Sequence, residues 1–365
     1  MVDAFPKEIE LKLFVSKQAN HDLLPQNKTY ISIKTGSNKY SNLICSLNPF
    51  NYQKILSEIK TFNPDVIHFP IEHAWNFVLL LALKNYPIVQ TIHDPVRHLG
   101  EENYFYDYLR HLAINRADRI IVLSNQFQKS FKRYGISKSR VDVIPHGTFS
   151  FAENTAEPPL NKKILFAGRI NKYKGLDVLL KAFLIILQKH PDAQLIIAGK
   201  GDLGGYYELI ESIKNLTIIN KYLSEQELKE LHNNCDFVVA PYIQASQSGV
   251  VATAAASGRA VIASNVGGIS EQIINNKTGI LVGPSNVNQL SNALIDLLEN
   301  PQKILEMGKN ASEEYKMNFS WDKIAQETLN TYLKAMDAFR LKRKSRNSTT
   351  RELLYSAYKS YRGQI

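Results

Sequence analysis

The feature that most constrains the fold is a regular alternation in the second half of the chain. From Lys163 onward, six short runs of β-branched and other apolar residues are separated by longer amphipathic segments. One of these segments, residues 176–190, spaces its apolar residues three and four apart, as a helix does when one face packs on a sheet. Such a repeat predicts a parallel, doubly wound α/β sheet. The six expected strands lie at residues 164–167, 195–198, 217–219, 237–240, 260–263 and 280–282.

The first half of the chain repeats this pattern more weakly. Helix-like segments occur at residues 52–61 and 104–116 among further strand-like runs. Open parallel sheets bind their ligands at the carboxyl ends of the strands. We therefore expect two Rossmann-like domains that face a shared cleft. The strand-like runs of the first half are residues 66–69, 88–92, 120–123 and 141–144.

The boundaries of these domains follow from composition. Pro158 and Pro159 stand in a polar stretch that is typical of a linker, and Trp321 opens a segment that is helical by pattern. No residue before Glu8 can supply the central first strand of a doubly wound sheet, so we expect residues 10–15 to be its second strand, beside a gap. The expected organisation is an amino-terminal domain at 1–151, a linker at 152–160, a carboxyl-terminal domain at 161–320, a helix returning toward the amino-terminal domain at 321–339 and a basic tail at 340–365.

The charge of the chain is concentrated in that tail. The net charge is +10, and residues 340–365 contain eight Lys and Arg residues against Glu352 alone. A basic end on a nearly balanced body indicates a local contact with anionic lipid or a polyanionic partner, rather than a basic protein surface of the kind that binds nucleic acid. The alternative is a tail that packs on its own amino-terminal domain or touches nothing.

The apolar runs, the first residues and the cysteines exclude several classes of protein. The longest uncharged apolar run, residues 77–83, is far below the ~20 residues that span a bilayer. The first eight residues carry charges where a signal peptide needs an apolar core, so we expect a cytoplasmic protein, peripheral on the inner membrane face where the tail binds lipid. Cys45 and Cys235 are too few for a disulfide framework or a four-cysteine metal site.

A basic loop follows the strand at residues 164–167. Gly168 allows a sharp turn there, and Arg169 and Lys174 then stand five residues apart before the next helix begins. The two cations can converge on one anion, Arg by bidentate contact and Lys as a point charge. The alternative is an ordinary solvated surface loop.

A second loop follows the strand at residues 237–240. Small polar residues precede an alanine-rich helix, which leaves the first amides of that helix open to the cleft and favours a phosphate. Ordinary capping by Ser246 or Ser248 is the alternative. The loop contains Ser246, Gln247, Ser248, Gly249 and Val250.

Other strand ends carry glycines and histidines. Gly199 and Gly201 form a turn, but the chain lacks the complete dinucleotide fingerprint, which disfavours a dehydrogenase. Histidines at such positions can bind sugar hydroxyls or phosphate, or can be plain loop residues. Their spacing matches no metal motif, so we expect no metal. The candidates on this side are His68, His73, His93, Asp94 and His146.

These motifs, taken in order, resemble glycosyltransferase family 4, the group 1 transferases of the GT-B fold. The likeness covers residues 65–333 and includes KILFAGRI at 163–170, LIIAGKGD at 195–202, GRAVIAS at 258–264 and GGISE at 267–271. It implies retaining, metal-independent sugar transfer from a nucleotide diphosphate donor, with no cofactor. The sequence SQSGV at 246–250 resembles the same segment of transferases that build bacterial surface polysaccharides, which implies a lipid-linked glycan acceptor.

The resemblance also assigns roles to residues. Arg169 and Lys174 would hold the leaving diphosphate, and the amides at residues 248–250 would cap its phosphate. Backbone near Tyr222 and Leu223 would meet the base, and His93 would approach the donor sugar. Gly168, Gly199, Gly201 and Thr253 would also line the donor site, with the loop at residues 246–250. Asp94 and the other three histidines would lie on the acceptor side.

Two glutamates that the family commonly carries are replaced. Counting back from Gly258 places Ala245 where one would face the sugar and Thr253 where the other would bind the ribose. Retention of the two cations favours an enzyme, whereas loss of the carboxylates favours a catalytically silent GT-B protein that binds a nucleotide sugar or a partner transferase. A nucleotide-sugar 2-epimerase of similar fold would need acidic residues around the sugar, and few occur.

Overall fold

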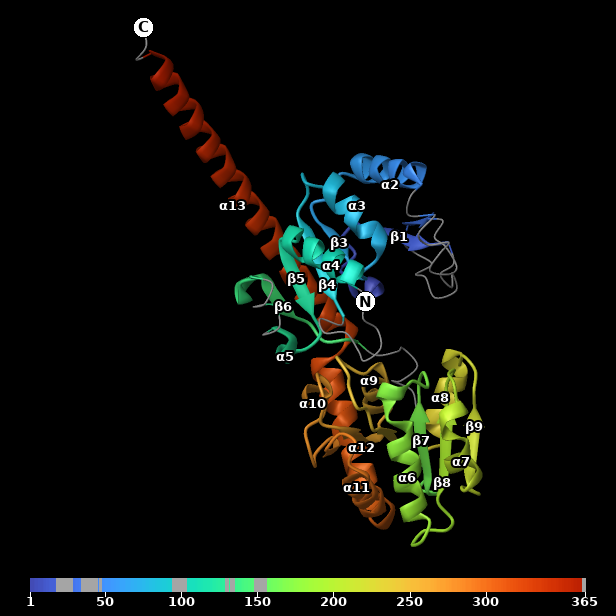
Figure 1. Cartoon of the computed structure of the whole chain (residues 1–365). Helices are drawn as coiled ribbons and strands as arrows, with labels where there is room; N and C mark the ends of the chain where they lie inside the picture. The colour runs from blue at the N-terminus through green and yellow to red at the C-terminus, as the bar shows by residue number, and fades with distance from the viewer. Residues whose placement is uncertain are drawn as a thin grey trace.

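The computed structural model describes most of the chain. It covers residues 1–17, 29–33, 45, 48–93, 104–128, 131, 135–147 and 156–362, with the backbone alone for residues 346–362. Asp94, one of the expected acceptor-side residues, lies outside the described residues. Two α/β domains lie one above the other, and a long helix runs along the amino-terminal one (Figure 1).

The carboxyl-terminal domain contains a six-stranded parallel sheet in the order β12-β11-β10-β7-β8-β9. All six strands expected from the sequence are confirmed. The chain leaves β7 toward β8 on one side and later returns to place β10 on the other, so the topological switch point lies between β7 and β10. The strands are β7 (Lys163–Ala167), β8 (Gln194–Ala198), β9 (Leu216–Ile219), β10 (Phe237–Ala240), β11 (Ala260–Ser264) and β12 (Gly279–Val282).

Helices cover both faces of this sheet because its strands are apolar on both faces. Phe166 of β7 is fully buried against one layer, where α6 (Leu176–Ile186) inserts Leu179 and Phe183. Leu165 faces the opposite layer with Val251 of α9 (Gly249–Ala256). The other helical elements are η6 (Lys172–Lys174), η7 (Gly204–Tyr206), α7 (Tyr207–Glu211), α8 (Glu225–Asn233), α10 (Ile269–Gln272), α11 (Val287–Glu299) and α12 (Pro301–Asn318).

The amino-terminal domain has a four-stranded parallel sheet in the order β3-β4-β5-β6 and a separate parallel pair, β1-β2. The sequence predicts residues 10–15 as the second strand of the doubly wound sheet, and this is wrong for that sheet, because β1 overlaps them but pairs with β2 in a sheet of its own. The strands are β1 (Lys12–Ser16), β2 (Thr29–Ile33), β3 (Ile67–Phe69), β4 (Ile88–Ile92), β5 (Arg119–Val122) and β6 (Val141–Val143). The helical elements are η1 (Val2–Ala4), α2 (Pro49–Phe62), α3 (Ala74–Ala82), α4 (Tyr104–Arg116), α5 (Asn125–Gln128) and η4 (Lys138–Arg140).

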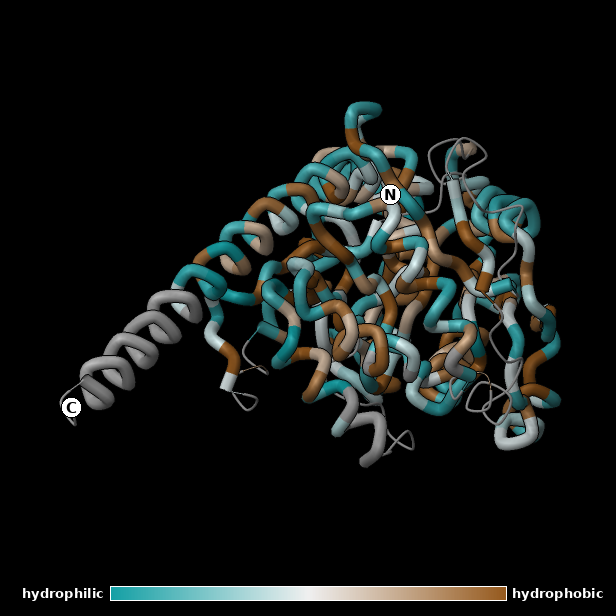
Figure 2. Tube along the Cα trace, turned by 90° about the horizontal axis from the view of Figure 1, so that it is seen from above, coloured by the Kyte–Doolittle hydropathy of each residue, from teal (hydrophilic) through white to brown (hydrophobic). Residues whose placement is uncertain are grey.

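The last helix, α13 (Trp321–Arg362), joins the end of the carboxyl-terminal domain to the amino-terminal domain. Its Ile324 and Ala335 are buried with Val89 and Ile121 of the amino-terminal sheet. The helix does not end near residue 339, as the sequence suggested, but continues through most of the basic tail and extends beyond the sheet (Figure 1). Seen from above, its described turns change between hydrophobic and hydrophilic residues (Figure 2).

Ion pairs fix α13 farther along the same surface. The ammonium of Lys342 lies 2.7 Å from a carboxylate oxygen of Asp118, whose side chain is buried, and Lys334 lies 2.8 Å from Asp142. One cation of the expected membrane-binding cluster therefore binds the protein's own amino-terminal domain. None of the helices that the model describes is long and apolar enough to cross a membrane.

His68 ties α13 to the middle of the amino-terminal sheet. One ring nitrogen lies 2.8 Å from the hydroxyl of Tyr332 on α13, and the other lies 2.8 Å from the hydroxyl of Thr91 on β4. Desolvation by the surrounding protein, aided by nearby His93, lowers the pKa of His68 from 6.5 to about 4. The folded protein therefore keeps this ring neutral at a pH at which the unfolded chain protonates it.

We expect this histidine to make the protein less stable in mild acid. Between pH 7 and pH 5 the unfolded chain gains a proton that the folded ring does not accept, which should cost about 2 kcal/mol of unfolding free energy. The variant His68→Gln should lose that part of the pH dependence, as measured by urea denaturation at the two pH values. The exposed His111 gives the control, His111→Gln, which should keep the wild-type dependence. Equal pH dependence in His68→Gln and wild type would contradict the assignment.

Candidate active site

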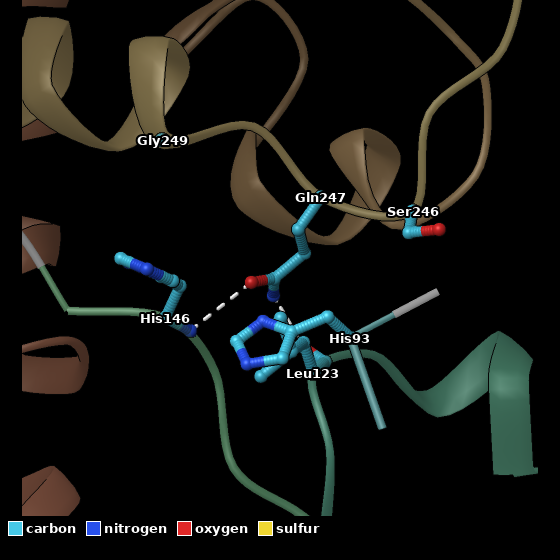
Figure 3. Close-up of a pocket in the computed structure, with 6 residues that line it drawn as sticks. All are labelled: His93, Leu123, His146, Ser246, Gln247 and Gly249. Atoms are coloured by element: carbon cyan, nitrogen blue, oxygen red, sulfur yellow. Dashed lines mark hydrogen bonds between the residues drawn. The ribbon is translucent and has the colours of Figure 1, made fainter. Parts of the chain in front are cut away.

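A cavity of 150 Å³ lies between the two domains (Figure 3). Three of its lining residues, His93, Leu123 and His146, follow β4, β5 and β6 of the amino-terminal sheet. The other three, Ser246, Gln247 and Gly249, belong to the loop between β10 and α9. The carboxyl ends of both sheets thus face one cavity, as expected for a pair of doubly wound domains.

Glycines allow the loops beneath this cavity to stack. Gly168 has φ +109°, and a Cβ there would lie 3.2 Å from the side chain of Val250. Gly199 has φ +146°, and a Cβ would overlap the carbonyl of Gly168, while a Cβ on Gly201 would overlap that of Ile170. In this structure the three glycines that the sequence assigned to the donor therefore bring backbone segments together.

The basic loop after β7 packs on the loop after β10. The amide of Ile243 donates to the carbonyl of Tyr173 at 2.7 Å, and a Cβ on Gly175 would overlap the carbonyl of Pro241. The ammonium of Lys174 consequently lies 3.7 Å from the ring centroid of the buried Tyr242. This contact holds the cation without neutralising it.

Arg169 is exposed at the start of the same loop. Its guanidinium forms no hydrogen bond or ion pair with any residue in the described part of the chain, and the same holds for the ammonium of Lys174. Two positive groups that lack an anion therefore stand at the switch point, where a ligand is expected to bind.

The start of α9 supplies further donors. Ser248 caps the helix, because its Oγ accepts from the amide of Val251 at 3.3 Å and donates to the hydroxyl of Tyr242 at 3.2 Å. Its own amide donates to Gln272 at 2.9 Å. The amides of Gly249 and Val250 have no acceptor among the described residues. The amides open to a ligand are thus those of Gly249 and Val250, and Ser248 acts as the cap.

Other expected donor residues are already engaged. Oγ1 of Thr253 donates to the carbonyl of Gly249 in its own helix at 2.7 Å, and the residue is buried. Leu223 packs on the core beneath the sheet, whereas the side chain of Tyr222 is 79% exposed beyond β9. Gln247 crosses the cavity: its Oε1 accepts from the amide of His146 at 3.0 Å, and its Nε2 donates to the carbonyl of Leu123 (Figure 3).

The structure separates the four histidines into two pairs. His93 and His146 line the cavity. His68 binds α13, and His73 caps α3 by accepting from the amide of Trp75, so neither lines the cavity. Nε2 of His93 lies 2.9 Å from the carbonyl of Pro70 and must donate to it, which leaves Nδ1 of the neutral ring as an acceptor.

The ring of His146 is held by the backbone of Gly147 and by the ring of Trp321. Its Nδ1 donates to the carbonyl of Gly147 at 2.6 Å, and its ring lies against Trp321 with centroids 6.2 Å apart. Burial lowers the pKa of His146 despite that hydrogen bond, and nearby His93 lowers it further. A neutral ring therefore faces the cavity at neutral pH.

Sequence reasoning missed three residues that shape this site. Tyr242 supports Lys174, Trp321 supports His146, and Glu271 contacts the amino-terminal domain beside Leu123. Glu271 belongs to the GGISE motif at residues 267–271, which contributes to the family resemblance but assigns no role to the carboxylate.

Comparison with known proteins agrees with this architecture. Residues 150–314 match the family model of glycosyl transferases group 1, and residues 9–148 match that of glycosyltransferase family 4. An uncharacterized glycosyltransferase of Methanocaldococcus jannaschii is 33% identical over 300 residues, covering 75% of this chain and 76% of that protein. D-inositol 3-phosphate glycosyltransferase of Pseudarthrobacter chlorophenolicus is 30% identical over 303 residues, covering 75% and 71%.

Solved structures share the fold. Sucrose-phosphate synthase of Thermosynechococcus elongatus aligns with TM-score 0.74 at 21% identity, over 90% of each chain. HepE of Anabaena in complex with UDP aligns with TM-score 0.67 at 19% identity, over 83% of this chain and 85% of that one. With two parallel-sheet domains facing one cavity, and with its sequence relatives, the chain belongs to glycosyltransferase family 4, the group 1 glycosyltransferases of the GT-B fold.

Proposed function

We propose that the protein transfers a sugar from a nucleoside diphosphate donor to a glycan acceptor with retention of configuration and without a metal. The observation that carries this proposal is the pairing of two unneutralised cations, Arg169 and Lys174, with the open amides of Gly249 and Val250 at one switch point. Packing of Gly168 against Val250 joins the two sets of donors. HepE, a structural neighbour, has been solved with UDP and with UDP-glucose, which supports a donor of this class.

These groups match the charge that develops during transfer. When the bond between sugar and phosphate breaks, negative charge grows on the departing diphosphate, and cations and amides already in place stabilise it. His93 lines the cavity from the opposite domain, and because its Nε2 is bound to Pro70, Nδ1 is the ring nitrogen left to bind a hydroxyl of the donor sugar. The proposed retention of configuration at the sugar is inferred from the family resemblance.

The acceptor side of the proposal rests on the tail. Arg343 and Lys344 are exposed on α13 beyond the ion pair of Lys342, and such cations favour an anionic membrane by about 1 kcal/mol each. We propose a lipid-linked glycan of surface-polysaccharide synthesis as the acceptor, with the protein peripheral on the inner face of the membrane. Deletion of residues 340–365 and vesicle sedimentation at low and high salt test this part.

A catalytically silent GT-B protein is the second candidate. Ala245 and Thr253 stand where family members commonly carry glutamates, and Thr253 is bonded within its own helix. Incubation with a panel of nucleotide sugars, with and without lipid extract, separates the candidates through release of the nucleoside diphosphate. No release from any donor, together with tight binding of one, would favour the silent protein.

Removal of either cation should reduce transfer. Arg169→Ala and Lys174→Ala should each lower turnover by about 10²-fold or more, or about 3 kcal/mol, as loss of one charge-stabilising donor does. Lys172 is exposed and lies in the same short helix, η6, as Lys174. Lys172→Ala is therefore the matched control and should retain activity. Full turnover in either test variant would remove the diphosphate clamp from the proposal.

A single open amide can be deleted without disturbing α9. Gly249 is the first helical residue, Ser248 before it is extended, and a Cβ at Gly249 would meet no atom within 4 Å, so proline fits there. Gly249→Pro should weaken UDP binding by about tenfold, the effect of one hydrogen bond to a charged group. Gly249→Ala keeps the amide and should bind as wild type does in calorimetry. Equal affinity of the two variants would place the phosphate elsewhere.

Transfer should proceed in EDTA. We propose that Arg169 and Lys174 supply the positive charge that Mg²⁺ provides in metal-dependent transferases. Among the described residues, no group of three or more His, Cys, Asp and Glu side chains is placed to hold a metal ion. Loss of activity on chelation, followed by recovery with Mg²⁺ or Mn²⁺, would refute this prediction.

A further inference from the structure

Two side chains of the carboxyl-terminal domain reach the same short segment of the amino-terminal domain, residues 123–126 at the end of β5. Gln247 binds the carbonyl of Leu123 from within the cavity. Glu271, the third residue of α10, binds the residues that follow. Glu271 does not line the cavity, and no role in donor or acceptor binding falls to it.

The carboxylate of Glu271 accepts two hydrogen bonds at each oxygen. Oε1 accepts from Oγ of Ser124 at 2.9 Å and from the amide of Gln126 at 3.0 Å. Oε2 accepts from the amide of Asn125 at 2.8 Å and from its side-chain nitrogen at 3.1 Å. All four partners are donors, so an ionised carboxylate, which only accepts, satisfies every one of them. A glutamine at this position would place its NH₂ group, itself a donor, against two of these donors.

The loop before α10, which leads into Glu271, is also tied to the donor side. The amide of Gly268 donates to the carbonyl of Ser246 at 2.9 Å, and a Cβ on Gly268 would lie 2.7 Å from Cβ of Ser124. The side chain of Gln126 donates back to the carbonyl of Gly267. This loop is therefore packed between the loop that precedes α9 and the end of β5.

We propose that Glu271 is a positioning residue for transfer. Its carboxylate fixes the end of β5 against the loop of Ser246, and thereby holds His93 and His146 opposite the open end of α9. The inference rests on the proposed function and deepens it: Glu271 sets the alignment of the two domains rather than the affinity for the donor. Loss of the carboxylate should misalign reacting groups, and a displacement of about 1 Å can cost on the order of 10²-fold in rate.

The first experiment needs no substrate. Small-angle X-ray scattering of the full chain without ligand should show a larger radius of gyration for Glu271→Ala than for wild type, with Glu271→Gln between them. Glu306 is an exposed glutamate on α12, so Glu306→Ala is the matched control and should scatter as wild type does. An unchanged radius of gyration in both Glu271 variants would overturn the proposal.

The second experiment separates positioning from general damage to the fold. For Glu271→Ala, kcat/KM with the donor identified by the nucleotide-sugar panel should fall by about 10²-fold, while UDP affinity measured by calorimetry stays within about threefold of wild type. Parallel loss of UDP affinity and activity would show a merely structural role and would also overturn the proposal. Where Glu271→Ala fails to fold, Glu271→Gln carries both measurements.

The two experiments also distinguish this proposal from the function on which it rests. If wild type releases nucleoside diphosphate from no donor but scattering shows that Glu271→Ala opens the protein, the proposed transfer fails and the domain contact stands. If wild type transfers sugar and both Glu271 variants transfer it at the wild-type rate, the proposed function stands and the positioning role fails.

Discussion

The close approach of two loops at the switch point of the carboxyl-terminal sheet is the constraint on which the site depends. Gly175, at φ +67°, lies so near the carbonyl of Pro241 that any side chain would overlap it. This contact places Lys174 over Tyr242, and Tyr242 in turn binds the cap of α9 through Ser248. The cations of the loop after β7 and the open amides at the start of α9 thereby lie at the same end of the sheet.

The second constraint is the helix that crosses from one domain to the other. Trp321 opens α13, and a Cβ on Gly147 would lie 2.7 Å from its ring, so the glycine lets the chain beside His146 pack closely. Farther along, Tyr332 binds His68, and Lys342 reaches the buried Asp118, which also accepts from the amide of Ile88 at 2.9 Å. An element that follows the carboxyl-terminal domain in sequence is thus part of the core of the amino-terminal one.

Strands and helices that depend on local sequence pattern could be predicted, whereas contacts between residues far apart in the sequence could not. The strands of the carboxyl-terminal sheet were recognisable because central parallel strands are apolar on both faces. His68 could not be assigned from its neighbours, because its partner Tyr332 lies 264 residues away, and the partners of Glu271 lie about as remotely, 145 to 147 residues away. The length of α13 was readable in principle, since neither Gly nor Pro interrupts residues 321–362.

The replacement of the two glutamates changes the electrostatic balance of the site. Arg169, Lys174 and the open end of α9 all favour negative charge, and none of the six residues lining the cavity is acidic. The carboxylate of Glu271 is bound to the end of β5. By the family resemblance, glutamates at positions 245 and 253 would face the sugar and the ribose and would add negative charge to this part of the site. In the proposed transfer the site therefore favours the diphosphate, and His93 is the cavity residue left to bind the sugar, because both polar atoms of the Gln247 side chain are already bonded to the amino-terminal domain.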